Sequence, residues 1–152
     1  MISIDERLYL LINGLVGRWP FVDRIVAFLV NDYFVVVVFS LLMLVFWFVG
    51  DTPGRRAHFQ TAFLGTSIGV ALTNVAVNLL NLFVVYRDRP FIQYPDAHLL
   101  FYRPHDSSFP ANSVAVSFAF AMGIYLAHRK TGIFAFALAS LFALTRVYSG
   151  VH

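Results

Sequence analysis

Two residues near the end of the sequence could do chemistry. Arg146 and His152 lie six residues apart, at the end of an apolar segment that carries almost no other charge. In a chain this hydrophobic, a cation at that depth is costly unless it has a function. A guanidinium matches phosphate oxygens, and a histidine can attack phosphorus or act as acid or base near neutral pH. The pair is therefore a candidate for one part of a phosphoryl-transfer site.

A second cationic group follows a long apolar run. Arg87 and Arg89 flank Asp88 there, and Pro90 limits how far a helix continues. The arginines are therefore expected at a membrane edge, where two interpretations are open. They pair with Asp88 in the headgroup region, or Arg89, assisted by Arg87, clamps a phosphate.

A helix start is the third candidate. Pro110 suits the first helical position, and small residues follow it through Ser113. Backbone N–H groups at a helix start, with the positive end of the dipole, can bind an anion. His98 and His105 precede this helix without a carboxylate pattern around them, so we expect no metal site.

The composition indicates a membrane protein. Of 152 residues, 59% are hydrophobic and only 12% are charged, against about a quarter charged in soluble domains. The 11 basic residues are scattered and the formal net charge is only +3, which argues against nucleic-acid binding. There are no cysteines, so disulfides and thiolate metal sites are excluded.

Apolar runs define the elements that must position these residues. Amphipathic helices over 4–15 and 21–30 are expected to lie in the interface, with Trp19 as an anchor. We predict an all-α integral membrane bundle of about four spans, forming one domain over residues 1–152. The spans are expected over 33–50, 59–86, 110–127 and 133–145.

The second span carries a polar stripe. Ser67, Asn74, Asn78 and Asn81 recur at helical intervals and share one face. We expect hydrogen bonds from these side chains to other helices, and lining of a substrate cavity is the alternative. The last span is rich in alanine, which permits close helix packing.

Topology decides which polar segments can meet. The short loops 51–56 and 128–132 each carry a basic pair, so the positive-inside rule places them in the cytoplasm. Segments 87–109 and 146–152 then share the outer face, because one helical hairpin separates them. Arg89, Arg146 and His152 are therefore expected to converge there with the start of the third span.

These residues resemble the type 2 phosphatidic acid phosphatase superfamily. Arg89-Pro90, Ser108-Phe109-Pro110 and the Thr145–His152 segment follow its three motifs in order and spacing. Residues 11–17 and the small size are similar to the bacterial branch related to bacitracin resistance, which hydrolyses undecaprenyl diphosphate. The resemblance covers essentially the whole chain and implies a site facing outward from a bacterial plasma membrane.

The resemblance also implies residue roles. His152 corresponds to the nucleophile that forms a phosphohistidine, and Arg89 and Arg146 to the phosphate-binding arginines. The backbone of the middle motif corresponds to Ala111, Asn112 and Ser113. The substrate is a lipid phosphate or diphosphate, and the family reaction needs no metal or other cofactor.

This chain departs from the family pattern at several positions. Leu82 stands in place of the motif lysine, and Ser113 in place of the histidine that protonates the leaving group. The aspartate that orients the nucleophile is expected four residues beyond His152, so the chain is interpreted as truncated after that histidine. We therefore expect weak activity, with His105 as a hypothetical replacement acid.

Two other functions remain open. A catalytically inactive relative would bind a lipid phosphate or assist another membrane protein, which the lysine and histidine losses favour. A transporter-like or structural bundle would use the asparagine stripe to line a pathway. No oligomeric state is predicted.

Overall fold

The part of the protein described by the computed structural model is helical. It comprises residues 12–83 and 110–149, and predictions that concern the rest of the chain lie outside it. Its helices are α2 (Pro20–Leu29), α3 (Phe34–Phe48), α4 (Pro53–Phe83), α6 (Asn112–Ala127) and α7 (Arg129–Tyr148). The predicted all-α membrane bundle is confirmed, and each predicted span has its helix.

The helices differ in whether they are long enough to cross a membrane. Within the described ranges, α4 and α7 are each long and apolar enough to cross a membrane alone. Helices α2 and α3 pass the same test together but are bent by 57° at the break between them. Helix α6 has 16 residues, about 24 Å at 1.5 Å per residue, and is shorter than a typical hydrocarbon core.

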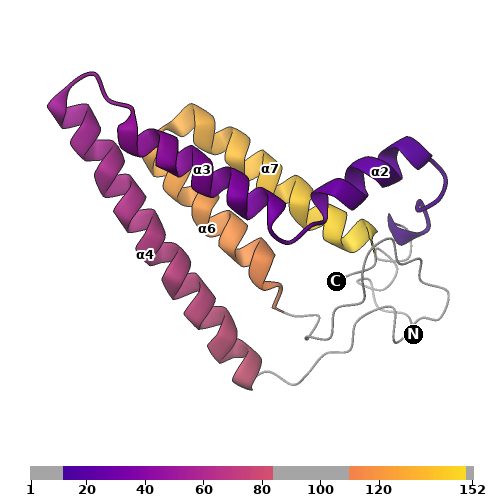
Figure 1. Ribbon diagram of the computed structural model, residues 1–152. Helices are drawn as coiled ribbons and strands as arrows, with labels where there is room; N and C mark the ends of the chain where they lie inside the picture. The colour runs from indigo at the N-terminus through magenta and orange to yellow at the C-terminus, as the bar shows by residue number, and fades with distance from the viewer. Residues whose placement is uncertain (1–11, 84–109, 150–152) are drawn as a thin grey trace.

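The helices run antiparallel, which sorts their ends into two groups (Figure 1). The α3–α4 and α6–α7 connections lie together at one end of the bundle, where His58 Nε2 lies 3.2 Å from the carbonyl oxygen of Ala127. The end of α4, the start of α6 and the end of α7 lie at the other end. The start of α6 and the end of α7, which were predicted to converge, therefore lie at the same end, whereas segment 87–109 lies outside the described residues.

The core lies between α3, α6 and α7. Helix α3 presents Val35, Phe39 and Met43 at intervals of four residues, so one helical face is buried. Helix α7 places two of its alanines, Ala135 and Ala139, in the same cluster. The prediction that alanines allow close packing is confirmed for these two.

Two connections are shorter than predicted. Residues 129–132 are not a turn but the first turn of α7, because His128 caps the helix and its side chain accepts from the backbone N–H of Thr131. Helix α4 likewise begins at Pro53, inside the predicted loop 51–56. The third predicted span starts at Asn112, with Ala111 as its N-cap, rather than at Pro110.

The polar stripe of α4 does not behave as predicted. Ser67, Asn74, Asn78 and Asn81 are all exposed. Ser67 Oγ donates to the carbonyl of Phe63 at 2.9 Å, and Asn78 Nδ2 donates to Asn74 Oδ1 at 2.8 Å. In the described structure these bonds stay within α4, because the stripe lies beside the face that packs on α6. The expected interhelical bonds are therefore wrong for this part of the chain.

Candidate functional site

Arg146 lies at the end of the bundle where α6 begins and α7 ends. It occupies the last turn of α7 and is only 3% exposed. Its Nη1 donates to the carbonyl of Val30 at 3.1 Å and forms an ion pair with Oδ1 of Asp32. The guanidinium carbon also lies 5.8 Å from the ring centroid of Phe142. The arginine predicted from sequence is thus held by partners from the α2–α3 break.

Each partner of Arg146 has a physical reason to be there. A buried cation requires a counter-charge, and Asp32 is the one charged residue between Arg24 and Asp51. Val30 is the C-cap of α2, and the last carbonyls of a helix have no intrahelical donor and carry its negative dipole end. The guanidinium therefore satisfies a helix end and a carboxylate together.

The start of α6 is suited to an anion. Ala111 is its N-cap in an extended conformation, and an alanine has no side-chain oxygen with which to cap the first N–H groups. Asn112 is exposed and Ser113 is half-buried, and the first turn carries no acidic residue. Ser117 Oγ donates to the Ser113 carbonyl at 2.7 Å, which leaves the backbone donors of the first turn unaffected.

The N-terminal segment packs on the last turn of α7. Asn13, 3% exposed, donates from Nδ2 to the Tyr148 carbonyl at 3.0 Å. The Tyr148 hydroxyl in turn donates to Asp23 Oδ1 at 2.7 Å, and its oxygen lies 3.2 Å from the Leu15 carbonyl oxygen. The other oxygen of Asp23 accepts from the N–H of Gly17, whose φ of 81° favours glycine in this turn.

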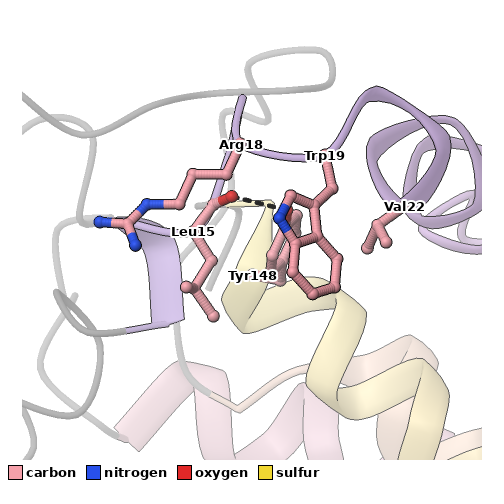
Figure 2. A pocket seen from close by; sticks show the side chains of 5 residues that line it. All are labelled: Leu15, Arg18, Trp19, Val22 and Tyr148. Carbon is pink, nitrogen blue, oxygen red and sulfur yellow. Dashed lines mark hydrogen bonds between the residues drawn. The ribbon is translucent and has the colours of Figure 1, made fainter.

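A small apolar pocket lies at this contact (Figure 2). Its volume is about 240 Å³, and Arg18 extends from its rim away from Trp19. Trp19 is 69% exposed, which fits the predicted interfacial anchor. The lining residues are Leu15, Arg18, Trp19, Val22 and Tyr148.

The predicted site residues divide into two groups. Arg146 and the backbone of Ala111, Asn112 and Ser113 lie at the same end of the bundle. Leu82, in place of the motif lysine, is 77% exposed on the last turn of α4 at that end. The other four, Arg87, Arg89, His105 and His152, lie outside the described residues.

Sequence reasoning missed Asp32 and Asn13. The signal for Asp32 was present, since a lone carboxylate beside a long apolar run needs a partner. Its partner follows 114 residues later in the chain, so sequence spacing could not identify it. Asn13 stood inside a segment interpreted as a surface helix, whereas residues 14–18 form a turn and the Asn13 side chain is buried where it bonds Tyr148.

Comparison with known proteins finds bacterial relatives, two of which are named undecaprenyl-diphosphatases and one a transport permease protein. YbjG of Escherichia coli (strain K12), provisionally named an undecaprenyl-diphosphatase, is 33% identical over 152 residues, covering 99% of this chain and 72% of YbjG. Undecaprenyl-diphosphatase BcrC of Bacillus subtilis (strain 168) is 23% identical over 149 residues, 98% of this chain and 72% of BcrC. The bacitracin transport permease protein BcrC of Bacillus licheniformis is 26% identical over 148 residues. No protein-family model matches the chain, and no solved structure matches it significantly.

Proposed function

Because the chain belongs to the undecaprenyl-diphosphatase family, as its similarity to YbjG shows, we propose that it hydrolyses a polyprenyl diphosphate through a phosphohistidine. Membership of this family supports a role in the hydrolysis of a lipid diphosphate in a membrane. The observation that carries the proposal is that the start of α6 and the last turn of α7, which contains Arg146, lie at one end of the bundle.

In the proposed complex, the diphosphate lies between the start of α6 and the end of α7. Backbone N–H groups of Ala111, Asn112 and Ser113 donate to phosphate oxygens, as helix starts do for anions. Arg146 and Arg89 supply guanidinium donors and positive charge. An arginine has five N–H donors, so Arg146 can keep its bonds to the α2–α3 break while it binds phosphate.

The proposed reaction has two steps. An imidazole nitrogen of His152 attacks the terminal phosphorus, a P–N bond forms, and the bond to the bridging oxygen breaks, so that the lipid monophosphate leaves. Water then attacks the phosphohistidine and the P–N bond breaks. Inorganic phosphate is released and the imidazole is restored.

The leaving group accounts for Ser113 in place of the family's histidine. Loss of a general acid typically costs about 10²- to 10⁴-fold. A lipid phosphate leaves as a stable anion and needs a proton far less than an alkoxide does. A diphosphate is therefore the substrate that this site hydrolyses best, and His105 is the proposed source of whatever proton is needed.

The proposed orientation places the site outside the cytoplasm. The basic pairs Arg55-Arg56 and Arg129-Lys130 lie in the first turns of α4 and α7. These helix starts lie at the end of the bundle opposite the last turn of α7, which contains Arg146. Basic residues near spans favour the cytoplasmic side, and acidic residues count little. Asp51, which bonds Arg55 at 3.3 Å, therefore does not alter this orientation.

A second candidate is a catalytically inactive relative that binds a lipid phosphate. It is favoured by the exposed apolar Leu82 at the position of the family's lysine and by Ser113 in the middle motif. Such a protein would keep the anion site of α6 and Arg146 but would form no phosphohistidine.

One experiment separates these functions. The purified protein in detergent is given undecaprenyl diphosphate labelled in its terminal phosphate, and both released phosphate and acid-labile label on the protein are measured. We expect release and labelling, and loss of both in His152→Ala. His58→Gln, at the opposite end of the bundle, is the control and should retain both. Binding of the lipid without label on the protein would instead establish the inactive relative.

A further inference from the structure

We infer that Asp32 is a positioning residue, which holds Arg146 in the orientation needed to bind the substrate phosphate. The inference rests on the proposed function, because it assigns Arg146 to that phosphate. Nothing in the three motifs involves Asp32, which lies in the break between α2 and α3.

The geometry gives Arg146 two anchors from one short segment. Its Nη1 donates to the Val30 carbonyl at 3.1 Å and is ion-paired with Asp32 two residues later. The 57° bend between α2 and α3 occurs at this segment, which brings both acceptors to the last turn of α7. Two acceptors on a single nitrogen restrict the rotation of a side chain that is otherwise long and flexible.

The charges indicate that this pairing is specific. Asp32 is the one charged residue between Arg24 and Asp51, and Arg146 is the one Asp, Glu, Lys or Arg after Lys130. The neighbouring helix α6 has no charged residue in its sequence. In these helices, Asp32 is therefore the counter-ion that the fold brings to Arg146.

The exposure of the two side chains differs. The Arg146 side chain is 4% exposed and that of Asp32 is 22% exposed. The arginine is thus enclosed and oriented, whereas the carboxylate retains contact with its surroundings. A misplacement of about 1 Å in a site that transfers a group can cost roughly 100-fold in rate. The fixed orientation of the Arg146 guanidinium is therefore expected to affect the reaction rate more than the presence of its charge alone.

A second contact provides a matched control. Asp23 on α2 accepts from the Tyr148 hydroxyl on α7 at 2.7 Å. This contact joins α2 to α7 two residues beyond Arg146, and it uses the same residue type as the contact of Asp32 with Arg146. A variant at Asp23 therefore loosens the docking of α2 on α7 without removing an anchor of Arg146.

The test compares Asp32→Asn, Asp32→Glu and Asp23→Asn with the wild type in detergent. It measures kcat/KM for undecaprenyl diphosphate and the inhibition constant of orthovanadate, which mimics the five-coordinate transition state of phosphoryl transfer. An inhibition constant does not depend on the fraction of protein that is active, so partial unfolding cannot imitate the effect. Asp32→Glu retains the charge, which protects folding while it displaces the carboxylate.

We expect both Asp32 variants to lower kcat/KM and to weaken vanadate inhibition, each by roughly 10- to 100-fold. Asp23→Asn should leave both quantities close to wild type. Wild-type inhibition in both Asp32 variants would overturn the inference, and so would an equal loss in Asp23→Asn. If the wild type releases no phosphate, the proposed function itself fails and the inference fails with it.

Discussion

Gly123 on α6 lies against Thr66 on α4 so closely that a Cβ on the glycine would be 2.7 Å from the Cβ of Thr66 and would overlap its Oγ1. Thr66 is fixed in turn, because its Oγ1 donates to the Ala62 carbonyl at 2.6 Å. The small residue therefore sets the distance between α4 and α6, as small residues do between membrane helices. The packing of α6, whose first turn belongs to the candidate site, on α4 depends on this contact.

Gly123→Ala should destabilise the protein, because α4 and α6 must move apart to admit the methyl group. Overpacking of this kind costs about 1–3 kcal/mol, measured as a lower thermal unfolding midpoint in detergent. Gly65→Ala is the control, since nothing lies within 4 Å of an added Cβ there. A midpoint for Gly123→Ala equal to that of Gly65→Ala would show that the contact is not tight.

Gly132→Ala should be more damaging than Gly123→Ala. A Cβ at Gly132 would overlap the Cα, Cβ and backbone nitrogen of Tyr125, whereas a Cβ at Gly123 meets side-chain atoms of Thr66. A backbone cannot move aside by changing rotamer, so the α6–α7 hairpin would have to open. Unfolding midpoints of the two variants measured side by side decide this, and a smaller loss for Gly132→Ala contradicts it.

Tyr148→Phe should weaken the docking of the N-terminal segment. It removes the hydroxyl that donates to Asp23 and lies beside the Leu15 carbonyl. A net loss of about 1 kcal/mol is expected for bonds of this kind, measured by thermal unfolding. Tyr33→Phe, where the tyrosine is 76% exposed, is the control and should leave the midpoint unchanged.

Ser113→His should restore the family's general acid. Hydrolysis of a lipid monophosphate, whose alkoxide leaving group needs a proton, should rise toward the roughly 10²- to 10⁴-fold that such acids contribute. Hydrolysis of the diphosphate should rise far less. Released phosphate is measured with both substrates, and Gln60→His at the opposite end of the bundle serves as control. Equal gains on both substrates would refute the explanation based on the leaving group.

His105→Ala should slow phosphate release if His105 replaces the missing acid. The effect should disappear in the Ser113→His background, because the new histidine then supplies the proton. Rates of the two single variants and the double variant are compared on undecaprenyl diphosphate. No change in His105→Ala alone would contradict the role.

Much of the fold could be predicted from the sequence because the relevant signals are local. Long apolar runs define the spans, and charge between them defines the ends, so α3, α4, α6 and α7 were all predicted, with errors of a few residues at their ends. The start of α7 was predicted wrongly, because Arg129-Lys130 has the composition of a loop. These residues instead form the first helical turn, and His128 is the N-cap. Motif spacing predicted Arg146 and the start of α6 as site residues, and both lie at the same end of the bundle.

The tertiary structure decided which distant residues meet. Arg146 was recognisable from its charge in an apolar segment, but its partner Asp32 lies 114 residues away and reaches it only through the bend between α2 and α3. The asparagines of α4 share a face by their spacing, yet packing against α6 leaves that face exposed. Hydrophobic periodicity is a property of a few turns of chain, whereas ion pairs and buried faces depend on how whole helices cross.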